Sequence, residues 1–465
     1  MTCPRPVPRR LAARLAAATA GLALAAGIPA LADVLRILDG DQEAAQARID
    51  LIQQARVSLD VEYFLVESDE ASLVGLALLR DAARRGVAVR LIVDASFNRM
   101  ARPIQAYLVS QGVEIREYHP LRLTKPCWMT RRLHDKLLLA DGSRMLTGGR
   151  NIANPYFGFG ERNYVDRDAF VTGGSVADAR AYFDDLWESR EVRGTRLRGY
   201  DPSVRNARCE DVSREDERWR CTARRNLAIK GYQRAEQELD RALAGLKQAS
   251  WVRWDTRNDW AEGQRDVGEV RFLHDPVGRK EGQRGIGDEI LDLMESASSS
   301  LTIESPYLLP SRAFLRALRD LLGRGVEVRV LTNSLNSTDN LLAQAGYVGR
   351  KEKLVRMGVE IWEFRGPESM HAKSAVIDGA ISIVGTFNID PRSEYLNTEQ
   401  AVVATDPDLS VRLRASMDAH LVNAYKIGTD GRPIGEKRRY PGASCYKIFK
   451  LTLLRLLAPF IRKQL

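Results

Sequence analysis

The sequence is poor in histidine and cysteine, and this scarcity limits the metal chemistry that it can support. Its 465 residues include only 5 His and 5 Cys, and no Cys-x-x-Cys pair occurs. A zinc site built on such a pair therefore has no support. The cysteine count is odd, and Cys3 would be lost if the N-terminus were removed. Cys209 and Cys221 could then form a disulfide in an oxidising compartment.

The N-terminus lacks an apolar run long enough for an ordinary membrane span. Its Ala/Leu-rich stretch, Leu15–Ile28, is shorter than the roughly 20 residues that cross a bilayer comfortably. Arginines precede this stretch and Ala30-Leu31-Ala32 follows it, a pattern typical of a secretory signal peptide. We expect residues 1–32 to be a signal peptide cut after Ala32, or an uncut N-terminal anchor. The body would then face the periplasm, held peripherally or by this anchor at a bacterial inner membrane.

The overall composition is that of a soluble globular protein with a basic excess. Hydrophobic residues make up 44% and charged residues 28%, and the chain is too long for one typical domain. A net charge of +9 favours an anionic partner, such as a nucleic acid, a lipid headgroup or a phosphorylated metabolite. A solvated, arginine-rich surface explains the same excess equally well.

The chain contains an internal repeat. Each half shows an apolar strand, an amphipathic helix and a second strand that begins with Gly-Val. These segments are Val57–Leu65, Ser72–Arg84 and Gly86–Asp94 in the first half, and Ser300–Leu309, Arg312–Leu322 and Gly325–Thr332 in the second. Alternating strands and helices predict an α/β fold, with a layered sheet in each half. Two similar halves indicate a pseudo-twofold molecule.

The repeat predicts the domain boundaries. We expect a first half over residues 33–193, a linker insertion over 194–268, a second half over 269–430 and a basic amphipathic C-terminal segment over 431–465. Within the insertion, Arg224–Leu246 is typical of an exposed amphipathic helix. The C-terminal residues from Cys445 mix apolar and basic side chains, which suits a helix on an anionic membrane surface. A terminal helix docked on the body is an equal alternative.

One spaced motif occurs once in each half. It reads His134-Asp-Lys136-x4-Asp141-x6-Gly148-Gly-Arg-Asn151 in the first half, and His371-Ala-Lys373-x4-Asp378-x6-Gly385-Thr-Phe-Asn388 in the second. Apolar residues followed by Asp-Gly predict a β-hairpin in both copies. His and Lys are two residues apart, so a strand places them on one face.

This set of side chains favours an anionic ligand. Because the chain has so few histidines, chance does not easily explain two copies of the motif with identical spacing. A lysine ammonium beside each histidine would repel a metal cation and offers no lone pair. Phosphoryl transfer needs cationic and amide donors around the phosphate oxygens, together with groups that attack and protonate. His134, Lys136, His371 and Lys373 are therefore the main catalytic candidates, and the two motif asparagines, Asn151 and Asn388, are candidates for phosphate binding.

The acidic residues need separate treatment. Asp141 and Asp378 belong to the motif and count among the catalytic candidates, but their Asp-Gly context favours a supporting role as turn formers. A histidine nucleophile needs a carboxylate that orients its other ring nitrogen. Asp168 and Glu399 are the preferred His-orienting residues. Asp166 and Glu394 are close alternatives to them.

The duplicated motif resembles that of the phospholipase D superfamily, and the resemblance extends from Val34 to Val422. Further segments are most similar to bacterial cardiolipin synthases, especially their cardiolipin synthase C branch; they are Gly148–Ile152, Ile303–Leu308, Gly385–Ser393 and Asn397–Glu399. The chain departs from the major branch of these synthases, which begins with two long transmembrane helices.

The resemblance implies a phosphatidyltransferase that makes cardiolipin through a phosphohistidine. It implies His134 as the nucleophile and His371 as the acid, although the two motif copies are equivalent in sequence. It also implies phosphatidylglycerol as the main substrate and phosphatidylethanolamine as a second one, an anionic membrane surface as partner, and neither cofactor nor metal. The need for a helper protein is left open, and no nucleic acid is expected as a partner.

Hydrolysis of phospholipids is the first alternative function. A superfamily nuclease is a weaker alternative, because an export segment and an apolar, basic C-terminus suit a lipid enzyme better.

Overall fold

The computed structural model describes residues 33–120, 130–254, 258–264, 266–280 and 282–457. The expected export segment, residues 1–32, lies outside the described residues, as does the end of the C-terminal segment, residues 458–465. The expectations for these two stretches therefore stay predictions.

The first half is an eight-stranded mixed sheet with the strand order β1-β8-β6-β5-β2-β3-β4-β9. Its strands are β1 (Val34–Leu38), β2 (Ser58–Tyr63), β3 (Ala88–Asp94), β4 (Val113–Tyr118), β5 (Lys136–Ala140), β6 (Arg144–Gly148), β8 (Asp168–Thr172) and β9 (Val192–Gly194). Its helices are α1 (Asp41–Gln54), α2 (Glu70–Arg84), α3 (Arg102–Ser110) and α4 (Val176–Glu188).

The second half repeats this topology strand for strand, in the order β10-β17-β16-β15-β11-β12-β13-β18. The strands are β10 (Val270–His274), β11 (Ser300–Glu304), β12 (Glu327–Asn333), β13 (Glu360–Phe364), β15 (Ser374–Ile377), β16 (Ile381–Gly385), β17 (Gln400–Thr405) and β18 (Ala424–Lys426). The helices are α7 (Ile286–Glu295), α8 (Arg312–Gly323), α9 (Leu341–Val348), α10 (Lys351–Met357), α11 (Pro391–Tyr395) and α12 (Pro407–Leu421). The predicted fold, two similar α/β layered halves, is confirmed.

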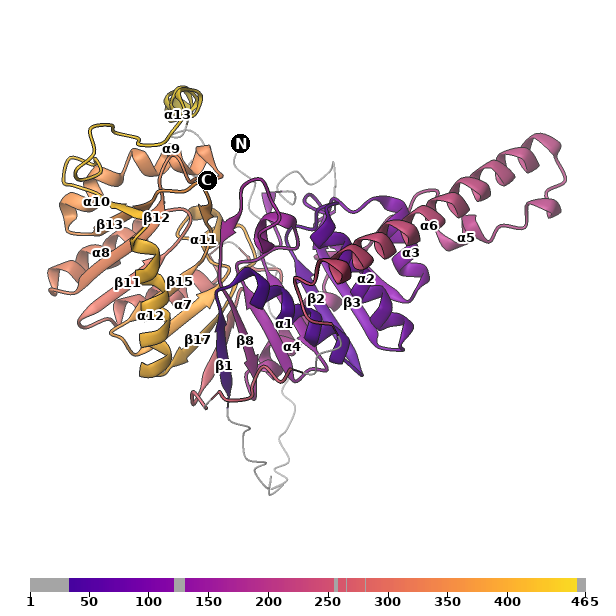
Figure 1. Ribbon diagram of the computed structural model, residues 1–465, viewed down its shortest axis with the longest axis horizontal. Coiled ribbons are helices and arrows are strands. Elements are labelled where there is room, and N and C mark those ends of the chain that lie inside the picture. Colours follow the sequence, from indigo (N-terminus) through magenta and orange to yellow (C-terminus); the bar gives the residue numbers. More distant parts are fainter. Residues whose placement is uncertain (1–32, 121–129, 255–257, 265, 281, 458–465) are drawn as a thin grey trace, which may run out of the picture. The chain divides into compact units, whose positions relative to one another are not determined.

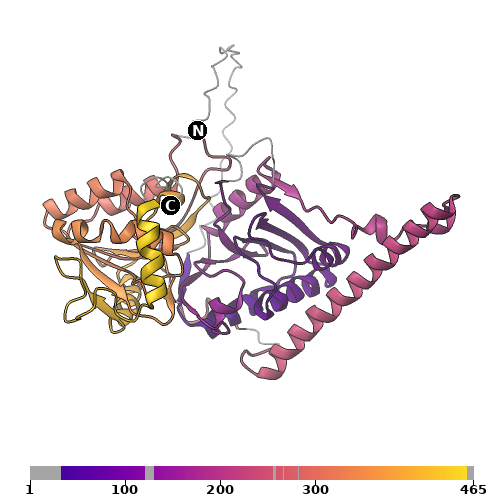
Figure 2. The same ribbon diagram turned by 90° about the horizontal axis from the view of Figure 1, so that it is seen from above.

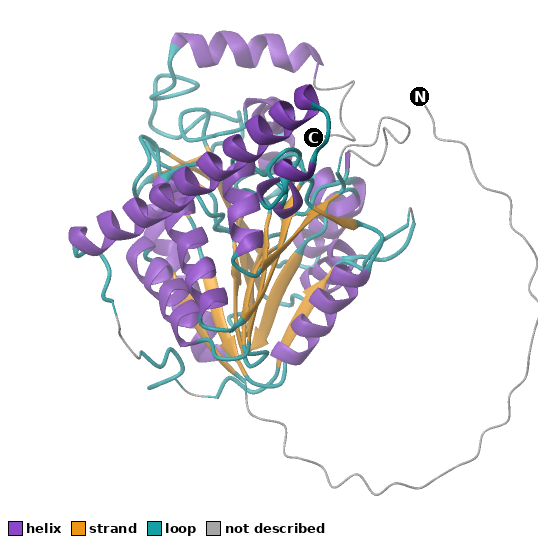
Figure 3. Ribbon diagram, turned by 90° about the vertical axis from the view of Figure 1, so that its right-hand side faces the viewer, coloured by secondary structure: helices purple, strands orange, loops and turns teal. Residues whose placement is uncertain are grey.

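Each sheet has an outer and an inner apolar face, because successive side chains of a strand point to opposite sides. On β5, Leu138 faces the core beneath α1 and α2, whereas Leu137 and Leu139 face the second half. The inner core also takes in α4 and α12, together with β16 and β17 of the second half. Helices thus flank the strands (Figure 3), and the inner strands of the two halves share one core.

A buried ion-pair network also crosses between the halves. Arg167, which is fully buried, contacts Asp39 at 2.6 Å, Ser374 at 2.9 Å and the carboxylate of Glu304. His420 in turn contacts Glu304 at 2.7 Å. A buried charge is costly unless it is paired, so this network fixes how the two halves meet.

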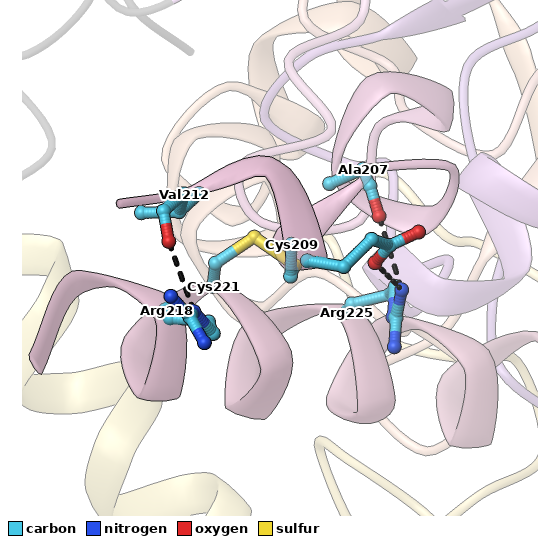
Figure 4. The surroundings of a disulfide bond; sticks show 7 residues. Ala207, Cys209, Val212, Arg218, Cys221 and Arg225 are labelled. Carbon is cyan, nitrogen blue, oxygen red and sulfur yellow. Dashed lines mark hydrogen bonds and ion pairs between the residues drawn. A yellow bond between two sulfur atoms is a disulfide. The ribbon is translucent and has the colours of Figure 1, made fainter. Parts of the chain in front are cut away.

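The segment expected as a linker insertion forms a long helix that packs on the first half. Helix α6 (Glu215–Ala249) starts earlier than the expected Arg224 and runs along α2 and α3 (Figures 1 and 2). A disulfide joins Cys209, in the short helix η3 (Cys209–Asp211), to Cys221 of α6. Figure 4 shows this bond between two arginines of α6, Arg218 and Arg225, which donate to the backbone of the preceding loop.

The C-terminal helix α13 (Cys445–Leu457) docks on α9 by one side only. Leu451 is buried there, and Lys447 donates to the carbonyl of Asn336 at 2.8 Å. On the rest of its surface, Tyr446 and Phe449 are 63% and 69% exposed. The docked helix, one of the two alternatives from the sequence, is therefore observed, and the helix keeps an exposed apolar face as well. Contact of this face with an anionic membrane surface, the other alternative, stays a prediction. Within the part of the chain that the structure describes, no helix is both long and apolar enough to cross a bilayer.

Candidate active site

The two motif histidines lie just before β5 and β15, and each takes a carboxylate from the opposite half. His134 Nδ1 lies 2.8 Å from Glu399 Oε2, and His371 Nδ1 lies 2.6 Å from Asp166 Oδ2. Both histidines are buried, with 8% and 6% of their surfaces exposed. Backbone contacts tie the halves together at this point, since His371 N donates to Val165 O at 2.7 Å. Each half therefore supplies the carboxylate that contacts the motif histidine of the other half.

The prediction that Asp168 orients a histidine is wrong. Asp168 is fully buried and pairs with Arg48 at 2.9 Å and Arg150 at 3.3 Å. In the strand register it stands opposite Gly148, as Ala401 stands opposite Gly385 in the second half. The residue equivalent to Glu399 is thus two positions earlier, at Asp166.

The other acidic alternative also lies elsewhere. Glu394 belongs to the short helix α11, where its carboxylate is hydrogen-bonded to Tyr395 and Ser311. Glu399 is the acid that the structure places on His134.

Asp141 and Asp378 lie at the far ends of β5 and β15, away from the histidines, and their assignment as catalytic residues is wrong. Asp378 accepts hydrogen bonds from three successive backbone N–H groups, those of Ser298, Ser299 and Ser300, each at 2.8 Å. Asp141 accepts from the matching N–H groups of residues 56–58. Both aspartates have left-handed φ angles, of 55° for Asp141 and 51° for Asp378. They clamp the hairpin turn to the start of the neighbouring strand, which is the supporting role that their Asp-Gly context favours.

The motif lysines lie beside the histidines in a buried setting. Lys136 Nζ donates to the backbone carbonyl of His134 at 2.6 Å, and Lys373 Nζ lies 2.8 Å from a ring nitrogen of His371. Burial lowers the pKa of Lys136 to about 7 and that of Lys373 to about 8. An anion bound between these lysines would stabilise their charged forms.

The motif asparagines end the loops that follow β6 and β16. Asn151 accepts from Leu65 N at 3.1 Å and donates to the Tyr156 hydroxyl at 2.9 Å. Asn388 Oδ1 is buried, and no donor among the described residues reaches it. Because a buried polar atom without a partner is costly, Asn388 is suited to contact a ligand.

The two histidines differ in their proton affinity. Burial lowers the pKa of His134 well below its ordinary value, and Lys136 and Lys373 lower it further. Burial and Lys373 also lower the pKa of His371, but the carboxylate of Asp166 opposes them.

The two orienting carboxyl groups differ as well. Burial raises the pKa of Glu399 to about 7 against the opposing charge of Lys136. Although burial acts in the same direction on Asp166, His371 and Lys373 hold the pKa of Asp166 below its usual range. The neutral form is therefore favoured more strongly for His134 than for His371.

Aromatic residues that the motif did not reveal surround both histidines. Tyr156 and Tyr164 contact His371, with ring centroids 5.4 and 5.0 Å away, whereas Phe64 contacts His134 at 5.1 Å. Tyr156 lies in the short helix η2 (Asn154–Phe157), three to six residues after Asn151. The sequence signal was the Asn-Pro-Tyr-Phe string just after the motif, which has no counterpart after Asn388.

The described residues hold no group of three or more His, Cys, Asp or Glu side chains placed to bind a metal ion. The charged groups closest to the histidines are instead the lysines and carboxylates described above.

Comparison with known proteins identifies relatives over most of the chain. A family model described as "Cardiolipin synthase, PLD-like domain" matches residues 49–187 and 290–421, one block in each half. Cardiolipin synthase C of Escherichia coli K12 is 28% identical over 405 residues, which cover 80% of this chain and 81% of that protein. An uncharacterized protein of Helicobacter pylori J99 is 25% identical over 420 residues, covering 84% and 80%.

A solved structure shares the fold over nearly the whole chain. The crystal structure of phosphatidylserine synthase from Haemophilus influenzae Rd KW20 superposes with a TM-score of 0.63 and 16% identity, and the match covers 94% of this chain and 97% of that one. At this level of identity the likeness concerns the fold alone.

Proposed function

Since the chain belongs to the family of phospholipase D-like cardiolipin synthase domains, we propose that it is a phosphatidyltransferase that makes cardiolipin from phospholipids. The single observation that supports this function best is the pair of buried motif histidines, each held through Nδ1 by a carboxylate of the opposite half. Such a pair supplies a nucleophile and an acid to one phosphorus centre.

In the first step, His134 Nε2 attacks the phosphorus of a donor phospholipid, and an N–P bond forms as the P–O bond to the headgroup alcohol breaks. His371 gives its proton to the departing oxygen. This assignment is supported by the electrostatics, because the pKa of His134 is held well below its ordinary value while Asp166 sustains the proton affinity of His371. A neutral imidazole is required for attack, and a protonated one for donation.

In the second step, His371 takes the proton of an incoming alcohol, which attacks phosphorus and releases His134. With the glycerol hydroxyl of phosphatidylglycerol as acceptor, the product is cardiolipin; with water, it is phosphatidic acid. Lys136, Lys373, Asn151 and Asn388 would neutralise and orient the phosphate oxygens. We infer phosphatidylglycerol as the main phosphatidyl source and phosphatidylethanolamine as a second one.

We further propose that the protein works on the periplasmic face of a bacterial inner membrane. The disulfide between Cys209 and Cys221 is typical of an oxidising compartment. The exposed aromatic side chains of α13, Tyr446 and Phe449, together with its basic residues, suit contact with anionic headgroups.

The roles of the two histidines can be separated with phosphatidyl-p-nitrophenol, whose leaving group departs without protonation. His371→Ala should react about 10²–10⁴-fold more slowly with phosphatidylglycerol. With phosphatidyl-p-nitrophenol it should still give a burst of p-nitrophenol and accumulate an acid-labile phosphatidyl adduct. His134→Ala should show neither burst nor adduct. His119→Asn is the matched control, because His119 lies outside the motifs and its left-handed φ of 48° is tolerated by asparagine.

The product decides between the two reaction types. Cardiolipin formed from phosphatidylglycerol vesicles by the purified wild-type protein supports the synthase. Phosphatidic acid as the sole product would replace the synthase with a phospholipase. An adduct in His134→Ala but not in His371→Ala would reverse the two roles.

A further inference from the structure

The first half contains an apolar cavity of about 200 Å³ between its outer helices and its sheet. The floor is formed by Val61 of β2 and Leu138 of β5, and the walls by α1 and α2. Trp251, just after α6, and Phe159, which is 43% exposed, lie at the outer rim, with ring centroids 4.6 Å apart. The cavity therefore runs from a partly exposed aromatic rim to the buried face of the sheet.

The internal repeat shows which residue leaves this space open. The equivalent space in the second half is about 40 Å³ and is lined by Phe314 and Phe387, whose rings stack 6.1 Å apart. Phe314 lies 11 residues before Gly325, and the residue 11 positions before Gly86 is Gly75. The first half thus has glycine where the second has a buried phenylalanine.

The second phenylalanine is replaced by a side chain that turns away from the cavity. Phe387 immediately precedes the motif Asn388, and the residue in this position of the first half is Arg150. The Arg150 guanidinium contacts Asp168 at 3.3 Å and Asp41 at 3.1 Å instead. Both aromatic side chains that fill the second half are therefore missing from the first. Because an empty apolar cavity lowers stability, its retention calls for a ligand.

The size and lining indicate an apolar chain as the ligand. An engineered apolar cavity of about 150 Å³ stays dry and binds benzene, so this larger space accepts a segment of several methylene groups. The polar members of the lining are Arg48, Tyr63 and Glu70. Arg48 and Tyr63 satisfy each other at 3.2 Å, Arg48 also pairs with Asp168, and Glu70 is exposed to solvent. The buried part of the lining therefore presents no unpaired charge that a hydrocarbon would desolvate.

One chain segment separates the cavity from the candidate active site. Within residues 151–159, Asn151 and Tyr156 belong to the site, where Tyr156 contacts His371. Ile152, Phe157 and Phe159 of the same segment line the cavity. Residues 151–159 therefore have the candidate active site on one side and the cavity on the other. A lipid whose phosphate binds at Asn151 has the cavity directly behind this segment.

We propose that the cavity is a binding pocket for one acyl chain of the phospholipid whose phosphate occupies the active site. The proposal deepens the proposed function and rests on it for the identity of the lipid. It assigns substrate-chain recognition to the first half only, since Phe314 and Phe387 fill the equivalent space in the second.

The test uses Trp251 as a contact reporter. Phosphatidylglycerol with a dibrominated stearoyl chain, supplied in mixed micelles, should quench the fluorescence of Trp251, and the quenched component should be missing from Trp251→Phe. In Gly75→Leu the new side chain enters the cavity, so the quenching should disappear and kcat/KM for dioleoyl-phosphatidylglycerol should fall about tenfold, the effect of losing burial of about two methylene groups. Turnover of dihexanoyl-phosphatidylglycerol should not change.

Gly75→Ala is the matched control. A Cβ at this position meets Ile152 at an ordinary 3.5 Å, so alanine gains the same helix propensity while leaving most of the cavity open. If Gly75→Leu does not fold, Ala71→Leu fills the rim instead. Quenching and chain-length preference that are unchanged in a folded, filled variant would overturn the pocket. If the variants change the quenching but the protein has no transferase activity, the pocket stands and only the proposed function is overturned.

Discussion

Replacing Asp378 with alanine is expected to cost stability while leaving the chemical step intact. The carboxylate accepts three backbone N–H groups at 2.8 Å, from Ser298, Ser299 and Ser300, and also the hydroxyls of Ser298 and Ser299 at 2.8 Å. Water can reach this turn and can replace the carboxylate as the partner of the two hydroxyls, so we take about 1 kcal/mol for each lost backbone hydrogen bond only. Alanine in the left-handed conformation at φ 51° adds about 1 kcal/mol. The expected total is about 4 kcal/mol, compared with stabilities of about 5–15 kcal/mol for typical domains.

Urea unfolding at 25 °C measures this loss of stability. The chemical step is measured as kcat with phosphatidylglycerol, at urea concentrations well below the unfolding midpoint. Asp378→Asn is the matched variant, since it retains an acceptor oxygen and tolerates the left-handed φ; its loss should be about half as large. A fall in kcat of more than about 100-fold (about 2.7 kcal/mol) with an unchanged urea midpoint would refute the reasoning and return Asp378 to the catalytic set.

The same carboxylate predicts a pH dependence. Although its small burial acts in the opposite direction, the N–H groups of Ser298–Ser300 hold the pKa of Asp378 below its usual range. A depressed pKa in the folded state means that the stabilisation is present above the unfolded pKa of about 3.9 and is lost as the pH falls below it. The difference in stability between wild type and Asp378→Ala should therefore be full at pH 7 and shrink in acid.

Three further outcomes are expected. Asp166→Asn should lower kcat about 10²–10⁴-fold and change its pH profile, as for other histidines that lose their carboxylate. Asp168→Asn should instead lower the urea midpoint, because it removes the carboxylate that pairs with buried Arg48 and one of the two that pair with buried Arg150. Binding of inorganic phosphate, followed by calorimetry, should weaken as the pH rises from 6 to 9, because the pKa values of the motif lysines are about 7 and 8 and their charge is lost on the alkaline side. Phe449→Ser with Leu453→Ser should lower co-sedimentation with phosphatidylglycerol vesicles by at least about tenfold, whereas Val422→Ser, which alters an exposed apolar side chain elsewhere, should not.

The repeat made the halves predictable, because the apolar strands and the amphipathic helices follow from local periodicity. The expected helix Arg312–Leu322 is α8, Arg312–Gly323, and the expected strand Gly86–Asp94 contains β3, Ala88–Asp94. The packing of the helices against other parts of the protein could not be predicted in the same way. Leu409, Leu413 and Met417 of α12 have the spacing of an amphipathic helix, but that spacing does not reveal that they enter the core shared by the two halves. Periodicity identifies the apolar face of a helix and not the surface that will cover it.

The same limit explains the error over the orienting acids. Histidine, lysine and asparagine lie at identical spacings in the two copies, so the sequence predicts that they belong to one site. The acids lie beyond a loop of unequal length, since Asn151 and Asp166 are 15 residues apart whereas Asn388 and Glu399 are 11 apart. Aligning the apolar strands that follow, Ala-Phe-Val-Thr172 with Val-Val-Ala-Thr405, would have matched Asp166 to Glu399.

The exchange of carboxylates between the halves also accounts for the two different tasks that we propose for the two copies of the motif. Each histidine lies on one half, but the group that tunes it belongs to the other, so a change in either acid acts on the opposite histidine. Glu399, with its pKa raised by burial to about 7, gives His134 a weaker anionic partner than Asp166 gives His371. Aromatic contacts differ as well, with Phe64 against His134 and Tyr156 against His371. These differences lie outside the motif, so two strings of identical spacing can differ as the proposed mechanism requires, with one imidazole neutral for attack and the other able to carry a proton.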